Sequence, residues 1–243
     1  MTVDSGARAR AARAAFFEEL HRRGEPFDYS RRAVEILRHR YICEAVRRLH
    51  PHPRRLLDVG CSMGQLTVQL AAVVPALVAV DLSRTAIGNA RERLRGAGAR
   101  ARFVLASVTA LPFRDGSFDV AVLSDGLHSW QLPREERQLA LAEAHQVLER
   151  GGHAVLTEYL QPRVFPEFVA QVRASPFEVV SIEYLYDRLW YQIESWFKAV
   201  RHWSWVERVF ASASFARFLC AFARIFGRRG SRHIAVAARK VAP

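Results

Sequence analysis

Short apolar runs alternate along the middle of the chain with longer segments in which apolar residues recur at helical spacing. Residues 56–59 form the first run, and Leu66, Leu70 and Val73 after it have the spacing of a helix. The same alternation predicts further strands at residues 76–81, 101–106, 118–123, 153–159, 178–186 and 234–239, and helices at about 30–49, 83–94, 133–148 and 165–172. In the helix at 133–148, the residues expected to face the sheet are Leu139, Ala142, Val147 and Leu148. Strands that alternate with helices are typical of an α/β fold.

Two segments flank this regular pattern. Residues 1–24 are predicted to form an arm, frayed or helical, that ends at a Gly-Glu-Pro sequence. Residues 187–232, between the last two strands, are too long for an ordinary connection. They carry two apolar stripes at helical spacing, which predict two helices: Leu189, Ile193, Trp196, Phe197 and Val200, then Phe215, Phe218, Leu219, Phe222, Ile225 and Phe226.

The formal net charge of +12 on the 243-residue chain is concentrated outside the predicted core. Residues 1–55 and 187–232 each carry a net charge of +6, whereas residues 56–186 carry −2. Arginine supplies nearly all of the basic charge, and its planar guanidinium suits contact with carboxylates or phosphates. An arginine-rich composition with solvated faces explains the charge equally well, so the charge alone identifies no partner.

The composition is that of an ordinary globular chain, with half of the residues hydrophobic and a quarter charged. Three widely separated cysteines, Cys43, Cys61 and Cys220, predict neither a disulfide framework nor a zinc site. No apolar run reaches the length of a membrane span, and the N-terminus lacks the apolar core of a secretion signal. We therefore expect a cytoplasmic protein.

A turn containing two glycines follows the first predicted strand, in the sequence from Asp58 through Gly60 to Gly64. Glycines at the carboxyl end of a parallel strand let the backbone approach a ligand closely, and the next helix offers free N–H groups there. In an open α/β sheet this edge is where ligands bind. The spacing lacks the third glycine of a dinucleotide fingerprint, which disfavours an NAD-dependent oxidoreductase but leaves it open.

Asp81 ends the second predicted strand, about 20 residues after the first glycine of the turn. A carboxylate at this distance is the signature of ribose recognition, because its oxygens accept hydrogen bonds from both vicinal hydroxyls. Alternatively, Asp81 caps the next helix, for which Ser83 is also a good N-cap.

Three sequence blocks in this order resemble the class I S-adenosylmethionine-dependent methyltransferases, in particular their small-molecule type 11 group. They are Asp58 to Gly64, where the family has D-x-G-C-G-x-G; residues 111–119, with the sequence LPFRDGSFD; and residues 141–152, with the sequence LAEAHQVLERGG. The resemblance covers residues 54–186 well. It implies a Rossmann-like fold with a seven-stranded, mostly parallel sheet, helices on both faces and a helical insertion before the last strand.

This resemblance also implies the division of the chain and its cofactor. Residues 54–186 would be the core that binds S-adenosyl-L-methionine, and residues 233–243 would supply its last strand. Residues 1–53 would form an N-terminal arm and helical cover, and residues 187–232 a helical insertion.

The family motifs place the cofactor-binding residues at the ends of the first four strands: Asp58, Gly60, Cys61, Ser62, Gly64, Asp81, Leu82, Ser107, Val108 and Ser124. Ser62 replaces the family's middle glycine, and Ser107 stands where an aspartate commonly accepts from the adenine amino group. His128, in a Leu-His motif beside the transferred methyl group, is the implied general base, with a structural role as the alternative.

Tyr29, Asp125 and Tyr159 are the expected substrate contacts. Arg38 and Arg40 are further candidates to reach the methionine carboxylate or an anionic substrate, with a surface position as the alternative.

The predicted function is methyl transfer to a small-molecule acceptor, with a hydroxyl group as the preferred nucleophile on an apolar compound that carries an anionic group, or on a biosynthetic intermediate. The alternatives are methylation of a membrane lipid or quinone, and cofactor binding without catalysis. No Asp/Asn-Pro-Pro-Tyr block is present, so nucleic acid is not an expected partner, and no metal site is expected. The insertion is expected to be a lid, a face that meets an anionic membrane or an acidic carrier protein, or simply core. The oligomeric state is left open.

Overall fold

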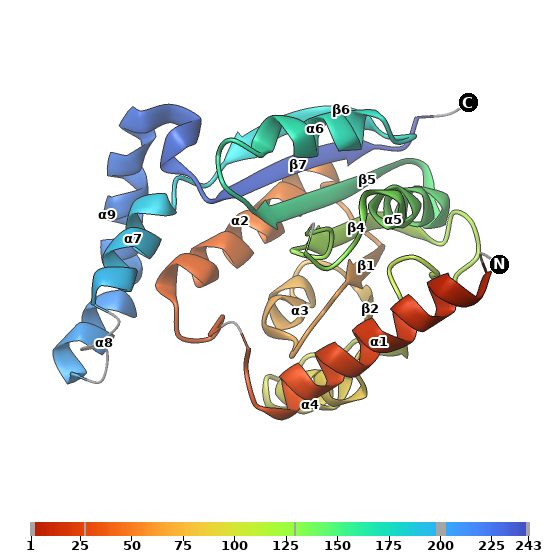
Figure 1. Ribbon diagram of the computed structural model, residues 1–243, viewed down its shortest axis with the longest axis horizontal. Helices are drawn as coiled ribbons and strands as arrows, with labels where there is room; N and C mark the ends of the chain where they lie inside the picture. The colour runs from red at the N-terminus through yellow and green to blue at the C-terminus, as the bar shows by residue number, and fades with distance from the viewer. Residues whose placement is uncertain (1–2, 27, 129, 198–202, 242–243) are drawn as a thin grey trace.

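Seven strands form a single sheet in the computed structural model, which describes residues 3–26, 28–128, 130–197 and 203–241 (Figure 1). The strand order is β3-β2-β1-β4-β5-β7-β6, and β7 runs antiparallel to both of its neighbours while the other pairs are parallel. The strands are β1 (Arg55–Val59), β2 (Ala76–Asp81), β3 (Arg102–Leu105), β4 (Phe118–Ser124), β5 (Leu148–Tyr159), β6 (Glu178–Tyr184) and β7 (His233–Arg239).

Helices cover both faces of this sheet, which is why its central strands are continuous apolar runs. Helices α2 (Ala33–Leu49) and α3 (Gln65–Leu70) pack with Val120 and Val122 of β4, and α5 (Arg134–Val147) and α6 (Phe165–Arg173) pack with Ala121 and Leu123. Alternate residues of a strand point to opposite faces, so the two groups of helices lie on opposite sides. Helix α4 (Arg84–Gly96) lies against β2 and β3. The predicted fold class is confirmed.

Several local boundaries differ from the predictions. The arm is a single helix, α1 (Val3–Arg22), and α2 begins at Ala33, because a turn at Asp28 and an extended Arg32 precede it. The expectation that Leu139 faces the sheet is wrong: its side chain is 43% exposed, and Ala140, Leu141 and Ala144 are buried in its place. Val147 and Leu148 are buried as expected, so the error concerns the first turns of α5.

Where the structure describes the insertion before the last strand, at residues 187–197 and 203–232, it has three α-helices and a 3-10 helix instead of two helices. They are α7 (Arg188–Trp196), α8 (Ser204–Phe210), α9 (Ala213–Ala223) and η2 (Arg224–Gly230). Figure 1 shows them stacked at one end of the sheet, beside α2. Helix α9 contacts both α2 and α7, so the insertion is attached to the core through α2. Val200 of the first predicted stripe lies outside the described residues.

Candidate functional site

A cavity of about 480 Å³ lies where β1, β2, β4 and β5 end, a size typical of small-molecule sites. Its wall is completed by side chains from α1, α2 and α7. Nearly all of the predicted site residues line it: Tyr29, Asp58, Gly60, Cys61, Ser62, Asp81, Leu82, Ser107, Val108, Ser124, Asp125, His128 and Tyr159. The sheet thus brings together residues that are up to 130 positions apart in the chain.

Gly64, the remaining predicted cofactor-binding residue, is not among the residues that line the cavity. Its φ is +81°, and a Cβ there would lie only 2.9 Å from the Cβ of Ala90 on α4. The glycine therefore allows α4 to pack against the start of α3, and its contact with the cofactor stays a prediction.

The turn before α3 is held by hydrogen bonds to β2. The N–H groups of Gly60 and Cys61 both donate to the carbonyl oxygen of Val80, at 2.9 Å. Ser62 adopts a φ of +47°, which side chains rarely favour, and its N–H donates to Asp81 Oδ2 at 2.8 Å. This bond helps a serine to occupy the position at which the family has a glycine.

Helix α1 holds the same turn from the other side through His21, which the sequence analysis missed. The buried His21 ring donates from Nδ1 to a carbonyl one turn earlier, and its Nε2 lies 2.9 Å from Ser62 Oγ. One turn before it, Glu18 accepts hydrogen bonds from the hydroxyls of Ser83 (2.8 Å) and Thr85 (2.6 Å) at the start of α4. The arm is therefore docked over the turn, and the hydroxyl that departs from the family motif is one of its contacts.

Two carboxylates, Asp58 and Asp81, stand at the ends of the neighbouring strands β1 and β2. Asp58 accepts a hydrogen bond from the Thr67 hydroxyl (2.7 Å), and Asp81 accepts from the N–H groups of Ser62 (2.8 Å) and Ser83 (2.9 Å). Burial raises the pKa of Asp58 to about 7, and burial also raises the pKa of Asp81. Because a cation or a hydroxyl donor would stabilise such buried carboxylates, this half of the cavity suits a ligand that carries both groups.

The residues that follow β2 and β3 line the cavity next to Asp81 and include one polar side chain, that of Ser107. Leu82, Ala106 and Val108 provide the apolar surface. Ser107 Oγ lies 2.8 Å from the Thr109 hydroxyl and accepts the Thr109 N–H at 3.2 Å. A hydroxyl has one donor and two acceptor sites, so Ser107 keeps capacity for one further hydrogen bond.

The other half of the cavity is built around Arg38, whose side chain is only 2% exposed. Its guanidinium contacts Glu35 at 2.8 Å and Asp125 at 2.8 Å, and it also donates to the Ser124 hydroxyl. Arg38 is therefore paired with carboxylates of the protein, which does not support its predicted contact with the methionine carboxylate or an anionic substrate. Arg40 is exposed on α2. Ser124, predicted to bind the cofactor, belongs to this second half.

The insertion and β7 complete this half with residues for which the sequence analysis found no role. The hydroxyl of Tyr191 on α7 donates to Glu35, and the ring of His233 on β7 contacts Asp187. Burial alone would raise the pKa of Glu35, but Arg38 in the first place, then His233 and Tyr191, lower it to about 2. In this half of the cavity, Glu35, Asp125 and Asp187 are thus each paired with a basic or hydroxyl group of the protein.

His128 lies on the loop after β4, where its ring is held in one orientation. Nε2 donates to the carbonyl oxygen of Tyr159 at 2.9 Å, which leaves Nδ1 as the nitrogen with a lone pair. That nitrogen has one long contact, 3.4 Å, with the N–H of Trp130. Burial lowers the pKa of His128 below its ordinary 6.5, so the ring is neutral at pH 7. A neutral imidazole with a fixed tautomer can accept a proton.

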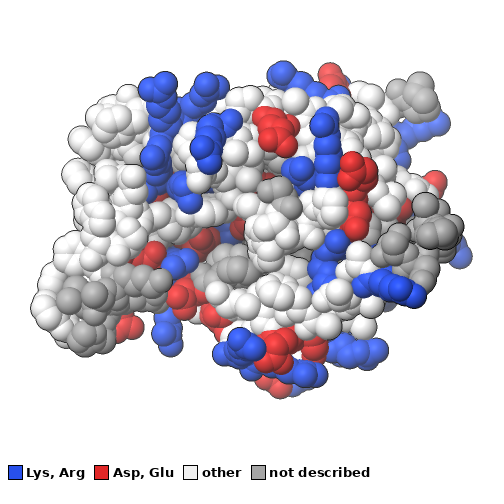
Figure 2. Space-filling model, viewed as in Figure 1, with Lys and Arg blue, Asp and Glu red and all other residues white. Residues whose placement is uncertain are grey.

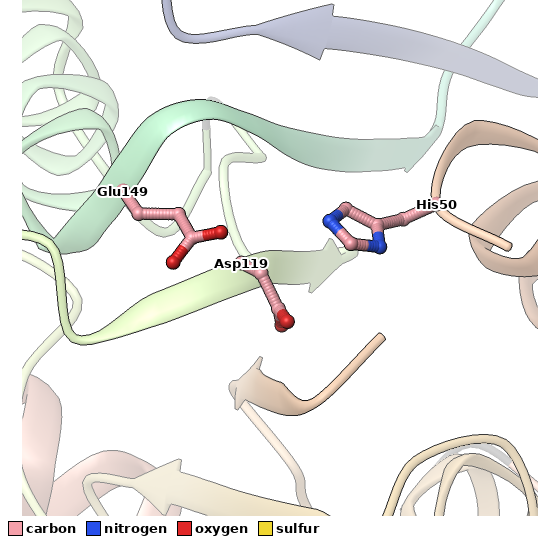
Figure 3. Close-up of side chains that lie close together, drawn as sticks. All are labelled: His50, Asp119 and Glu149. Carbon is pink, nitrogen blue, oxygen red and sulfur yellow. The ribbon is translucent and has the colours of Figure 1, made fainter. Parts of the chain in front are cut away.

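Figure 3 shows a second group of polar side chains, His50, Asp119 and Glu149, whose ligand-type atoms lie within 4.8 Å of one another. The group sits where β4 and β5 begin, at the opposite edge of the sheet from the cavity. Asp119 already accepts the N–H groups of Arg54 (2.6 Å) and Arg55 (2.9 Å), and the Arg54 guanidinium lies 3.2 Å from Glu149. These carboxylates anchor the start of β1, and we assign no metal site to them.

Comparison with known proteins finds a methyltransferase domain in the sequence. Residues 57–156 match the family model Methyltransf_11, described as a methyltransferase domain. The chain is 29% identical over 141 residues to a demethylmenaquinone methyltransferase of Thermus thermophilus, an alignment that covers 57% of each chain. Overall, the chain spans about half the length of the curated relatives it matches.

Two solved structures share the fold. The N-methyltransferase NodS of Bradyrhizobium japonicum, in complex with S-adenosyl-L-homocysteine, has a TM-score of 0.66 and 14% identity, over 93% of this chain and 97% of that one. The cyclase SpnF has a TM-score of 0.62 and 20% identity, over 84% and 82% of the two chains. At these identities the likeness concerns the fold alone. Residues 57–156 of the chain are therefore a methyltransferase domain, and the whole sheet has the fold shared with these two structures.

Proposed function

We propose that this protein transfers a methyl group from S-adenosyl-L-methionine to a hydroxyl group of a small molecule. The observation that carries the proposal is the pair Asp58 and Asp81, which stand at adjacent strand ends in a cavity whose other half holds an oriented neutral histidine, His128. The first feature suits the cofactor, which combines an ammonium group with a ribose. The second suits an acceptor that must lose a proton.

The residues present fit the cofactor in the arrangement that the family motifs imply. Asp58 would hold the ammonium group, Asp81 would accept from the ribose hydroxyls, and Leu82 and Val108 would contact the adenine. Ser107 would bond the adenine edge with its one remaining site. When bound, the cofactor would supply a methyl group made electrophilic by a positively charged sulfur.

The chain itself would orient the acceptor, exclude water and take the proton. The acceptor lies in the half of the cavity bounded by Tyr29, Asp125 and Tyr159, with its hydroxyl directed to Nδ1 of His128. The Tyr159 carbonyl keeps the proton on Nε2, so Nδ1 receives the hydroxyl proton as the new bond forms. Helices α1, α2 and α7 line the cavity and would limit the access of water to it. Exclusion of water favours a reaction in which charge moves between the sulfur and the acceptor oxygen.

The Asp81→Ala variant tests the cofactor arrangement. We expect it to bind S-adenosylhomocysteine about 1.5–3 kcal/mol more weakly, because the charged acceptor of the ribose hydroxyls is lost. Isothermal calorimetry measures this, and Asp115→Ala, at an exposed aspartate outside the cavity, is the control. Equal affinity of a folded Asp81→Ala variant and the parent would remove Asp81 from the site.

The raised pKa of Asp58 predicts pH-dependent binding. A carboxyl group with a pKa of about 7 must lose its proton before it can hold an ammonium group. We therefore expect the affinity for S-adenosylhomocysteine to be about tenfold lower at pH 6 than at pH 8. In Asp58→Asn the affinity should be low and should not change over this range. Calorimetry at the two pH values decides the matter, and a parent affinity that stays constant contradicts this role of Asp58.

A hydroxylated aromatic ring of the quinol type is the second candidate acceptor, and the relative named demethylmenaquinone methyltransferase favours it. Loss of the hydroxyl proton to His128 would make the ring carbons nucleophilic, so the same base serves transfer to oxygen or to carbon. Incubation with a reduced naphthoquinone and with an aliphatic alcohol, followed by mass spectrometry and NMR of the products, distinguishes the two. Cofactor binding without product from any acceptor would favour the third possibility, a binding module without catalysis.

A further inference from the structure

Helix α9 is apolar on two opposite faces, and only one of them is covered. Its inner face, with Ala216, Leu219 and Ala223, is buried against α2 and α7. On its outer face, Phe218 is 65% exposed, Phe222 is 48% exposed, and Ile225 at the start of η2 is 69% exposed. These three residues follow one another at intervals of four and three, so they form a single stripe along the helix. A contiguous exposed apolar stripe of this kind is typical of a surface that binds a partner or a membrane.

The helices that contact α9 carry further exposed aromatic side chains. Trp196 at the end of α7 is 75% exposed, and Trp203, Trp205 and Phe226 are about half exposed. Among the residues that the structure describes, 14 large apolar side chains are exposed, and eight of them lie in the stretch from Trp196 to Phe226. The exposed apolar surface is thus concentrated on the insertion, which we call the aromatic face: Trp196, Trp203, Trp205, Val209, Phe218, Phe222, Ile225 and Phe226.

The aromatic face is bordered by arginine. Exposed arginines lie on α8, α9 and η2: Arg208, Arg217, Arg224, Arg228 and Arg229. Over residues 203–230, all of which the structure describes, Glu207 is the one acidic residue. Figure 2 shows this end of the molecule, over α7–α9, as a broad white area with Lys and Arg side chains along its upper border. The combination of Trp and Phe with arginine is that of helices that lie in a membrane interface.

We propose that the aromatic face docks on the surface of a membrane that contains anionic lipids. The apolar stripe enters the boundary between headgroups and acyl chains, while the arginines pair with lipid phosphates. Among the described residues, no single helix is long and apolar enough to cross a membrane. The residues Ser204–Ala211 and Ala213–Gly230 meet that length and composition only as a pair bent by 61°, and α9 is fixed to the core along one side. The helices therefore lie on the membrane.

Charge argues for lipid and against a second copy of the chain. A symmetrical contact through the stripe would bring the arginines of both copies into one interface, with little acidic charge nearby to compensate them. An anionic lipid surface supplies phosphates for the arginines and an apolar phase for Phe218, Phe222 and Ile225. An acidic soluble protein would satisfy only the arginines.

Docking in this position would connect the membrane to the cavity. Helix α7 carries Trp196 on the aromatic face and, two and five residues earlier, Glu194 and Tyr191 in the cavity wall. An apolar acceptor dissolved in the membrane would thus meet the protein beside the half of the cavity that we assign to the acceptor. This consequence rests on the proposed function, but the docking itself does not.

Sedimentation of the full chain with lipid vesicles tests the proposal. We expect binding to vesicles of phosphatidylglycerol and phosphatidylcholine to be about tenfold or more tighter than binding to phosphatidylcholine alone, and to weaken as salt is raised. The triple variant F218S/F222S/I225S and the triple variant R217E/R224E/R228E should each bind the anionic vesicles about tenfold or more weakly than the parent. Circular dichroism should give the parent's spectrum and melting temperature for both variants, which shows that they are folded.

Matched variants elsewhere on the surface are the controls. L105S/L139S/V180S removes three apolar side chains that are 43–48% exposed, and R95E/R100E reverses two exposed arginines on and after α4, so both should bind vesicles like the parent. If the parent does not sediment with anionic vesicles, or if the face variants bind as well as the controls, the proposal is overturned. A parent dimer in ultracentrifugation that F218S/F222S/I225S dissociates would also overturn it. None of these outcomes depends on methyl transfer or on cofactor binding by the parent.

Discussion

His128→Ala should lower the turnover number by about 10²–10⁴, with the affinity for S-adenosylhomocysteine almost unchanged. The variant loses the only group placed to take the hydroxyl proton in the proposed mechanism, while the half of the cavity that holds Asp58 and Asp81 stays intact. Because the pKa of His128 is lowered from 6.5, the ring is already a base at pH 7. The parent's turnover should therefore fall only below pH 6.5, and this acid limb should be missing in the variant.

Steady-state rates with the acceptor identified by product analysis measure this effect. His145→Ala is the matched control, since His145 lies on α5 and its pKa is also lowered by burial. A loss below tenfold in His128→Ala, with the acid limb retained, would mean that the reaction proceeds by alignment alone. The histidine would then be a structural residue that ties its loop to Tyr159.

Arg38→Met should lower the free energy of unfolding by about 3–5 kcal/mol, the second large effect that we expect. The substitution keeps much of the side chain's volume but removes the cation between Glu35 and Asp125. These carboxylates would be left in a buried place without their common partner. Equilibrium unfolding in urea at pH 7 measures the loss. Arg40→Met, on the exposed side of the same helix, is the control and should change stability by about 0.5 kcal/mol or less.

The difference between Arg38→Met and the parent should shrink in acid. In the parent the pKa of Glu35 is about 2, below the ordinary 4.5, so its contribution to stability is present above pH 4.5 and is lost as the pH falls towards 2. Without Arg38, the pKa of Glu35 is lowered less, so the variant has less of this stability to lose over the same pH range. The difference between the two curves should thus shrink as the pH falls from 4.5 towards 2. A constant difference from pH 3 to pH 7 would show that the loss comes from packing and not from charge.

The positions of the strands along the chain, and the half of the cavity that holds Asp58 and Asp81, can be predicted from the sequence because both follow from local patterns. The turn from Asp58 to Gly64 and the acid Asp81 each follow a buried strand directly, and parallel strands place such residues at one edge of a sheet. Local patterns also set the limits of accuracy. In α5 a period of 3.6 residues was found, but Leu139 was placed on the wrong face, since a run of Leu and Ala supports neighbouring phases almost equally well.

The second half of the site was not accessible in this way, because its contacts join distant segments. His21 and Ser62 are 41 positions apart, Arg38 and Asp125 are 87 apart, and Glu35 and Tyr191 are 156 apart. A charged residue on an amphipathic helix has the same local pattern whether it faces water or a buried partner. For this reason Arg38 was treated as a residue for a ligand or for the surface, and Glu35 and His233 were not considered.

By itself, then, the sequence determined an α/β sheet, the resemblance to methyltransferases and most residues of the cavity wall at the ends of β1 and β2. Each of these rests on residues that are near neighbours along the chain or on fixed spacings between strands. Only the tertiary structure decided that the arm is a helix docked on Ser62 and that the charge of Arg38 is balanced by carboxylates inside the protein. It also decided that the insertion has one buried and one exposed apolar face. The physical reason is the same in each case. Burial and charge pairing depend on what lies across a gap in space, and a one-dimensional pattern does not specify that neighbour.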